Sequence, residues 1–371
     1  MTKFSFNQAV PFEATHVGDV IKDELSARGM RQSELAELTG IHKPILNDVI
    51  KGKRSLTPEM ALLLEPALGI SATYLMNIQS QYELDCARQS ERVVLQTKML
   101  EIWNVLKEQV SVPFFKNTGI VKGNIIEDVK RILGVFSVDS LDEFFGLKAK
   151  EMELSYYRKS DKVKTNPADI LSWKYYCYYL AKNDKSNLCP FKKEADTNTL
   201  TKELKYIFKE NKDTVNQIEK ALNKYGIRFL IVNKVGQVPI DGMSFWTGDN
   251  PTIVITKRIA TIDNFAFTTL HEIGHVFKHL TQDGNARINL TETERGIEES
   301  EADDFASNAI FPNATWKKLM SRMRDIPPYK IEPYIRAEAE KHNANPQLLF
   351  GRYKHDIGIY KIRNPFETRI L

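Results

Sequence analysis

The residues that could do chemistry lie between Asn264 and His279, in the stretch NFAFTTLHEIGHVFKH. At its centre His271 and His275 are four residues apart, and Glu272 follows the first of them. On a helix, positions i and i+4 lie on one face, so both imidazoles can reach the same ion. Zinc accepts imidazole ligands, and a catalytic zinc site keeps one position open for water. A carboxylate at Glu272 can take a proton from that water, so the spacing predicts metal-assisted hydrolysis with Zn²⁺ as cofactor.

A helix must carry this motif. Asp263 or Asn264 can cap its start, and Gly284 is expected to follow its end. Apolar residues recur at helical spacing along it, at Phe265, Phe267, Leu270, Val276 and Phe277. The motif taken alone also fits a buried helix with two hydrogen-bonded histidines.

The next helix is expected to supply a third ligand. Glu294–Ile310 (ERGIEESEADDFASNAI) has a helical pattern that stops before Pro312. Glu298 falls near the middle of its apolar face and Glu301 on the flank, so the pattern slightly favours Glu298. The alternative is that both glutamates are solvated on an acid-rich helix.

The stretch HEIGHVFKH, followed by ESEADDFASNAIFP, resembles the ImmA/IrrE family of zinc metallopeptidases. The resemblance extends over roughly residues 150–315 and implies a zincin-like metallopeptidase domain, which we place at residues 151–315. It implies His271 and His275 as zinc ligands and Glu272 as the general base. Glu301, the glutamate of Glu-Ala, becomes the third ligand on this ground, and Glu298 stays the alternative.

His279 lies on the same side of the helix as His275. If the helix continues, however, it is about 12 Å along the axis from His271, which one ion cannot bridge. We therefore expect His279 to contact a ligand or the substrate rather than the metal.

A second pattern covers residues 16–80, where five helices are expected. They are predicted at Val17–Arg28, Gln32–Thr39, His42–Ile50, from Thr57 onward, and around Ser71–Ile78. Two short helices joined by a tight turn at Gly40, with helices on either side, are typical of a helix-turn-helix domain.

In such a domain the second helix of the pair enters the major groove of DNA. Its expected DNA-facing residues are His42, Lys43 and Asn47, and an asparagine can read adenine through two hydrogen bonds. Three basic residues that follow, Lys51, Lys53 and Arg54, suit contacts with phosphates. The alternative is a helical protein-interaction domain that does not bind DNA.

This segment, from HVGDVIKDELSARG through GKRSLTPEMALLLE to SQYEL, resembles HigA-type antitoxins of the Xre/Cro helix-turn-helix class. The resemblance implies a homodimer that binds a palindromic operator, often its own promoter. It also implies a cognate toxin as a partner.

The remaining segments predict a mainly α fold with a small β-sheet (α+β). Residues 1–15 are expected to form an N-terminal arm, 81–150 a helical linker or dimerisation region, and 316–371 a C-terminal helical extension. Further helices are expected at Tyr82–Gln109, Lys122–Phe145 with a break at Gly134, Trp173–Lys182 and Leu200–Tyr225. Strands are expected at Ile227–Val232, Gly242–Trp246 and Ile253–Thr256. We expect Met243–Trp246 to form an exposed edge that can hold an extended peptide.

Composition adds limits on location. No run of about 18 apolar residues or signal peptide is visible, so neither a membrane span nor export is expected. The cysteines, Cys86, Cys177 and Cys189, are odd in number and lack metal spacing, as expected for reduced thiols in the cytoplasm. The net charge of +4 indicates nothing about partners.

The sequence thus predicts a DNA-binding transcriptional regulator or antitoxin that carries a zinc-dependent endopeptidase domain. Its expected substrate is a repressor-type protein, and it is expected to autoregulate its operon, with a peptidase activity that can be latent or conditional. The alternative is a non-enzymatic antitoxin-repressor whose peptidase-like domain binds a partner or senses a signal.

Overall fold

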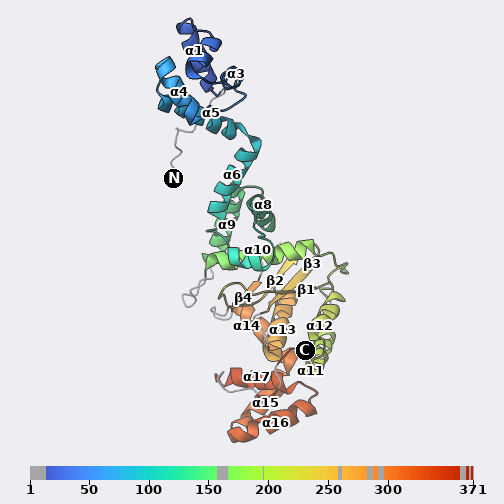
Figure 1. The fold of residues 1–371 in the computed structure, drawn as a ribbon. Coiled ribbons are helices and arrows are strands. Elements are labelled where there is room, and N and C mark those ends of the chain that lie inside the picture. The colour runs from blue at the N-terminus through green and yellow to red at the C-terminus, as the bar shows by residue number, and fades with distance from the viewer. Residues whose placement is uncertain are drawn as a thin grey trace. The chain divides into compact units, whose positions relative to one another are not determined.

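The computed structural model describes residues 14–156, 166–194, 196–257, 261–281, 287–290, 296–359, 365–366 and 369–370. The chain divides into two compact units, Met1–Ile102 and Trp103–Leu371. Helices dominate both units and one small sheet lies in the second (Figure 1), which confirms the predicted fold class. Most of the predicted N-terminal arm, residues 1–13, lies outside the described residues.

Unit 1 begins with five helices, as predicted. They are α1 (Val17–Ala27), α2 (Gln32–Thr39), α3 (Lys43–Ile50), α4 (Pro58–Leu68) and α5 (Ala72–Gln89). Side chains cap three of them: His16 accepts a hydrogen bond from the Gly18 amide, Thr57 from Met60 and Ser71 from Tyr74. The turn between α2 and α3 contains Gly40 at φ 68°, a left-handed conformation that glycine adopts without strain.

The core of unit 1 is built from the apolar stripes of these helices. Leu46, Val49 and Ile50 of α3 are at most 1% exposed, as expected for the inner face of this helix. They pack with Val17, Ile21, Leu35, Ala61 and Leu64 of the neighbouring helices. Burial of α3's inner face leaves its other face to point outward.

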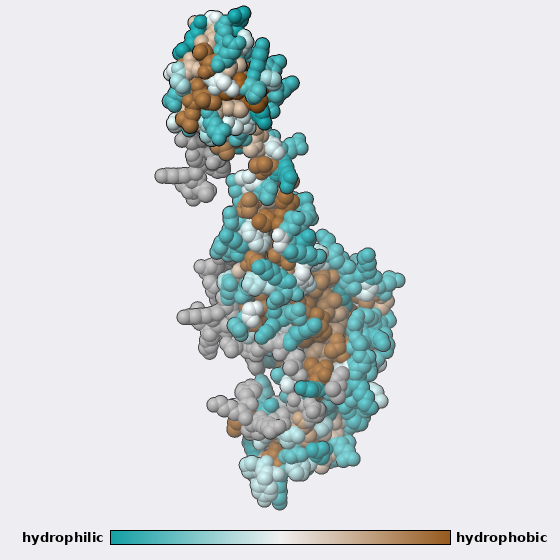
Figure 2. All heavy atoms as spheres, in the orientation of Figure 1, coloured by the Kyte–Doolittle hydropathy of each residue, from teal (hydrophilic) through white to brown (hydrophobic). Residues whose placement is uncertain are grey.

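The prediction of one helix over Tyr82–Gln109 is wrong. Ser90 is extended, with ψ 117°, and separates α5 from α6 (Glu91–Leu106). Within α6 only Leu106 is buried, whereas Val93, Val94, Leu95, Leu100 and Val105 are between 37% and 51% exposed. Figure 2 shows this apolar surface along α6.

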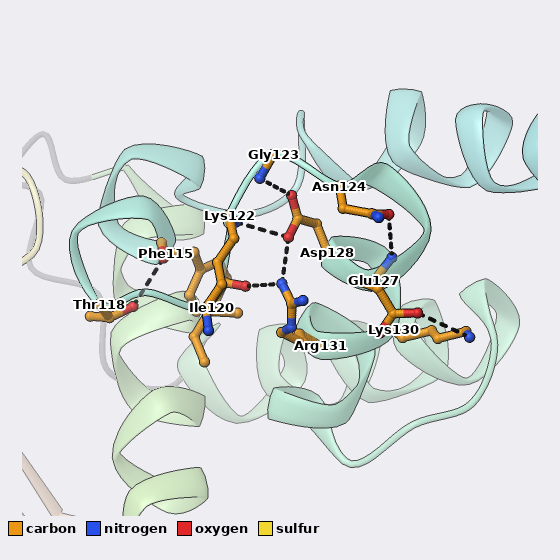
Figure 3. A network of polar contacts seen from close by, with 10 residues as sticks. All are labelled: Phe115, Thr118, Ile120, Lys122, Gly123, Asn124, Glu127, Asp128, Lys130 and Arg131. Carbon is orange, nitrogen blue, oxygen red and sulfur yellow. Dashed lines mark hydrogen bonds and ion pairs between the residues drawn. The ribbon is translucent and has the colours of Figure 1, made fainter.

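Unit 2 opens with α7 (Val112–Asn117), α8 (Ile125–Phe136), α9 (Leu141–Tyr156) and α10 (Pro167–Asn183). The buried Asp128 fixes the loop before α8, because its carboxylate accepts hydrogen bonds from the amides of Lys122 and Gly123 and from Arg131 (Figure 3). The expected break at Gly134 is absent, since α8 runs through it to Phe136.

The aromatic residues of α10 are buried or half-buried against neighbouring elements. Tyr175 packs against Phe136 of α8 with tilted rings whose centroids are 5.0 Å apart, and Tyr178 meets Phe245 edge to face at 4.6 Å. The Trp173 indole donates a hydrogen bond to the carbonyl of Asn233. These contacts place α10 against the sheet.

The sheet contains β1 (Arg228–Val232), β2 (Ile240–Thr247), β3 (Asn250–Thr256) and β4 (Arg287–Leu290) in the order β1-β3-β2-β4. β1 and β3 are parallel, and β2 is antiparallel to both β3 and β4. The expected free edge at Met243–Trp246 is wrong for Met243 and Ser244, which pair with Ile288 and Arg287 of β4. Strand β4 was not predicted, because four residues are too few to show a recognisable period.

The helix that carries the histidine motif, α13 (Ile262–Lys278), packs on one face of the sheet. A Cβ at Gly242 of β2 would lie 2.7 Å from Glu272 of α13, whereas Phe245 faces α10. Successive side chains of a strand point to opposite faces, so α13 and α10 cover opposite faces. The helix begins at Ile262 after an N-cap at Thr261, earlier than the predicted cap, and ends before His279; Gly284 lies outside the described residues.

The other helices surround α13. They are α11 (Thr197–Glu210), α12 (Thr214–Asn223), α14 (Ile297–Ile310), α15 (Asn313–Met323), α16 (Pro328–Lys341) and α17 (Pro346–Asp356). The predicted helix over Leu200–Tyr225 is two helices, since Asn211 and Asp213 have positive φ between them. The helices after residue 315 share one hydrophobic core with α13 and the sheet.

Candidate metal centre and helix-turn-helix surface

The two histidines of the motif each point their Nε2 atom toward a common position between α13 and α14. His271 and His275 are 2% and 1% exposed, and their Nε2 atoms are 3.0 Å apart. The four-residue spacing on α13 brings the rings together, with centroids 4.7 Å apart.

A carboxylate of α14 completes the group, and it is Glu299. Its Oε2 lies 3.2 Å from Nε2 of His271, and its Oε1 lies 3.4 Å from Nε2 of His275. Within the described part of the chain these three side chains form the one group of His, Cys, Asp and Glu residues with metal-binding spacing. The predicted third ligand Glu301 and its alternative Glu298 are not in this group.

The donor set fits zinc. Ligand atoms about 2.0–2.1 Å from a tetrahedral zinc ion are about 3.3 Å from one another. The two Nε2 atoms are 3.0 Å apart; Nε2 of His271 lies 3.2 Å from Oε2 of Glu299, and Nε2 of His275 lies 3.4 Å from Oε1. One ligand atom from each side chain is thus close enough to the others to share one ion. Two imidazoles and one carboxylate are also the ligand set of one common class of catalytic zinc site, which keeps a fourth position for water.

Charge holds Glu299 ready as an anionic ligand. Burial works to raise the pKa of its carboxyl group, but hydrogen bonds from His271 and His275 outweigh burial and hold the pKa far below its usual range. The carboxylate therefore stays ionised beside the two histidines.

Sequence reasoning also missed Asp303, which lies on the same helix as Glu299. Its Oδ1 is 2.9 Å from Nδ1 of His271, on the side of the ring opposite Nε2. Burial lowers the pKa of His271, but Asp303 and Glu299 outweigh it and raise the pKa to about 10. The spacing of four between Glu299 and Asp303, which puts both on one helix face, is the signal that could have found the pair.

Glu272 is fully buried beside this group. Neither of its carboxylate oxygens has a hydrogen-bond partner among the described residues. Burial raises the pKa of Glu272 to about 8, although the charge of His271 acts in the opposite direction. A buried carboxylate without a partner is costly, so its presence indicates a chemical role.

His279 and Glu301 lie behind His275. His279 Nδ1 is 3.0 Å from Nδ1 of His275, and His279 Nε2 is 2.9 Å from Oε2 of Glu301. The ring of His275 therefore stands between His279 and the shared spot, so His279 cannot ligate an ion there.

The predicted DNA-facing residues lie on the outer face of α3 and in the loop that follows it. His42, Lys43, Lys51, Lys53 and Arg54 are exposed, and Asn47 is half-buried. The backbone carbonyl of Asp48 accepts hydrogen bonds from the amides of Lys53 and Arg54, which fixes the start of the basic loop next to α3. Direct contact with bases or phosphates remains a prediction for all six residues.

Comparison with known proteins finds two separate stretches of the chain that match family models. A family model described as helix-turn-helix matches residues 21–75, and one described as IrrE N-terminal-like domain, a peptidase family, matches residues 223–337. No match was found among the curated proteins.

Two solved structures illustrate the likeness of the N-terminal segment. The Pseudomonas aeruginosa antitoxin HigA with higBA promoter is 30% identical, over 20% of this chain and 84% of that one, with a TM-score of 0.20. An addiction module antidote protein of the HigA family from Coxiella burnetii is 23% identical, over 23% of this chain and 95% of that one, with a TM-score of 0.22.

The chain therefore carries a segment of helix-turn-helix type and, further along, a segment of IrrE-like peptidase type. Both matches agree with the two resemblances seen in the sequence. Of the helices that the structure describes, none is long and apolar enough to cross a membrane.

Proposed function

We propose that this chain is a DNA-binding regulator of antitoxin type whose second unit is a zinc-dependent endopeptidase. The observation that carries the proposal is the convergence of His271, His275 and Glu299 at separations of 3.0 to 3.4 Å, with Glu272 beside them. Three protein ligands with a neighbouring carboxylate are what a hydrolytic zinc site requires.

His271, His275 and Glu299 would hold the ion, and Asp303 would fix the ring of His271 through Nδ1. A zinc ion bound there supplies Lewis acidity for a peptide carbonyl and lowers the pKa of water. The chain's own contribution to the chemistry is Glu272, which accepts a proton from water and returns it to the leaving peptide nitrogen. Burial supports this role, because it brings the pKa of Glu272 to about 8, near the pH at which the proton must move.

Elemental analysis of the purified full chain tests the metal centre. Glu299→Gln keeps the shape of the side chain and removes its charge, so we expect it to lose zinc that the wild type holds at about one ion per chain. Glu301→Gln, on the same helix, tests the ligand predicted from the sequence and should still hold about one ion per chain at saturating zinc, since Glu301 is 52% exposed and contacts His279 instead. Glu332→Gln is the control and should keep its zinc, since Glu332 is 42% exposed and its ion-pair partner is Arg336. Equal zinc content in wild type and Glu299→Gln would refute the ligand assignment.

Cleavage is tested separately with candidate repressor proteins, including the chain's own N-terminal unit. Zinc-loaded wild type should cleave at least one of them, and Glu272→Gln should retain zinc and lose cleavage. Cleavage that survives Glu272→Gln would refute the role of Glu272.

We propose that unit 1 binds operator DNA through α3 and that the chain works as a homodimer. The half-buried Asn47 and exposed Lys43 of α3 and the exposed basic residues after it support DNA binding. The exposed aliphatic residues of α6 support pairing with a second copy, because a helix with one buried residue needs a partner surface. Sedimentation of wild type beside Val94→Glu tests this, and an unchanged dimer would refute a role for α6.

A non-enzymatic role, in which the second unit senses or binds a partner, is favoured by one observation. His271, Glu272 and His275 are at most 2% exposed, and β4 pairs with the strand beside them. A centre so enclosed cannot admit a peptide without movement, which also fits a peptidase that is active under particular conditions. A cognate toxin is the remaining proposed partner, and co-purification with the product of a neighbouring gene tests it.

A further inference from the structure

The two histidines of the metal centre are supported from behind in different ways. Nδ1 of His271 meets a carboxylate directly, at 2.9 Å from Asp303. Nδ1 of His275 meets another imidazole, that of His279, at 3.0 Å, and a carboxylate comes next, with Glu301 at 2.9 Å from Nε2 of His279.

The proton positions in this second chain of contacts follow from elementary rules. An imidazole that binds a metal through Nε2 is neutral there and carries its proton on Nδ1. His275 must then donate from Nδ1, so Nδ1 of His279 must accept. His279 accordingly carries its proton on Nε2, where it donates to Glu301. Each contact has one donor and one acceptor, and no other assignment leaves Nε2 of His275 free for an ion.

The backbone holds His279 in place for this task. His279 is the C-cap of α13, and its amide donates to the carbonyl of His275 at 2.9 Å. Its side chain is 7% exposed, so the ring is enclosed between His275 and α14. Glu301, at 52% exposed, closes the chain of contacts at the surface of α14.

We propose that His279 and Glu301 are a positioning pair that fixes the tautomer and ring orientation of His275. This inference rests on the proposed zinc centre, since it takes Nε2 of His275 as the ligand atom. With it, α14 supplies one ligand, Glu299, and both outer carboxylates, Asp303 and Glu301. Glu301, which the sequence predicted as a ligand, thus acts on His275 indirectly, through the imidazole of His279.

Zinc affinity of the full chain, measured at one pH by competition with a chelator, tests the pair. His279→Leu keeps a side chain in the enclosed space but has no acceptor for His275, so affinity should fall about 10-fold to 100-fold. His279→Gln offers a carbonyl to His275 and an amide to Glu301, and it should retain most of the wild-type affinity. The Co²⁺ absorption spectrum should change in His279→Leu and stay like the wild type in His279→Gln.

Glu301→Ala is a second test of the positioning pair, and it changes an exposed side chain instead of an enclosed one. The loss should be about twofold to fivefold, the size expected of an exposed ion pair, and it should vanish when His279→Leu is already present. Glu332→Ala is the matched control, because Glu332 is also an exposed glutamate with one ion pair, to Arg336 at 2.8 Å, and it should leave affinity unchanged.

The outcomes separate this inference from the function on which it rests. Wild type without zinc affinity overturns the metal centre and the positioning pair together. Zinc binding by the wild type with equal affinity in His279→Leu overturns the pair alone. Equal losses in His279→Leu and His279→Gln also overturn it, since they would show that ring packing, and not the acceptor, matters.

Discussion

Gly242 of β2 is predicted to be the residue that makes room for the candidate base. A Cβ built there would lie 2.7 Å from Oε1 of Glu272, and 3.1 Å from Cγ of Glu272 and from Cγ2 of Thr268. Real Cβ atoms essentially never approach other atoms to 2.7 Å, so Gly242→Ala forces either the carboxylate or the strand to move. Overpacking of this kind costs about 1–3 kcal/mol.

Thermal unfolding of the full chain, followed for the transition of unit 2, measures this cost. At about 2–4 °C per kcal/mol for a unit of this size, Gly242→Ala should lower the midpoint by about 2–12 °C. Gly134→Ala is the control: it lies inside α8, a Cβ there meets nothing within 4 Å, and alanine favours a helix by up to about 1 kcal/mol. Its midpoint should stay level or rise.

A double variant identifies the atom that gives way. In a Glu272→Ala background the contacts with Oε1 and Cγ of Glu272 are gone, while the contact with Cγ2 of Thr268 remains. Gly242→Ala should then cost clearly less than it does alone, a coupling that a mutant cycle measures. An equal cost in both backgrounds, or no cost at all, would refute the view that Gly242 keeps space for Glu272.

Three further predictions concern other parts of the chain. Burial lowers the pKa of His16, whose neutral Nδ1 accepts a hydrogen bond from the Gly18 amide at the start of α1. Unit 1 should therefore lose stability as the pH falls below about 6.5 and through the lowered pKa of His16. His16→Asn, a cap that does not titrate, should abolish this loss, and NMR titration of His16 together with urea unfolding checks both expectations. Asn47→Ala should weaken binding to an operator fragment by about 1–3 kcal/mol and leave the salt dependence of binding unchanged. Lys53→Ala should instead reduce the slope of log affinity against log salt concentration by about one, and binding titrations at several salt concentrations distinguish the two effects. The Arg352 guanidinium donates to two carbonyls at the end of α14, each at 2.7 Å, so Arg352→Met should destabilise unit 2 by about 2–4 kcal/mol in urea unfolding, and unchanged stability would contradict that role.

The elements that the sequence predicted well are those with local signals. The helix-turn-helix helices agree to within a residue or two at most ends because caps and glycines mark them, such as Thr57 before α4 and Gly40 after α2. Elements whose limits depend on partners were predicted less well. Strand β4 exists through pairing with β2, and α8 continues through Gly134 because its other residues are packed against neighbours.

The candidate metal centre shows the same contrast between residues with a local signal and residues whose place depends on a partner helix. His271, Glu272 and His275 follow from a spacing on α13, but the third group depends on how α14 is rotated against it. Gly274 fixes part of this rotation, since a Cβ there would meet Cα of Ala302 at 3.2 Å.

At about 100° per residue, Glu299 lies about 60° to one side of Ala302 and Glu298 about 40° to the other, while Glu301 lies about 100° away on the side of Glu298. The contact at Ala302 alone therefore leaves Glu298 and Glu299 as alternatives, one on each side. The choice depends on which side of the helix pair the Nε2 atoms occupy, and no spacing within α14 contains that information. Of the two, only Glu299 has a residue four positions later, Asp303, that contacts one of the two histidines, with its Oδ1 2.9 Å from Nδ1 of His271. The pair Glu299 and Asp303, four residues apart, is thus visible in the sequence, but its place in the site follows from the structure, which brings Glu299 and not Glu298 to the two Nε2 atoms.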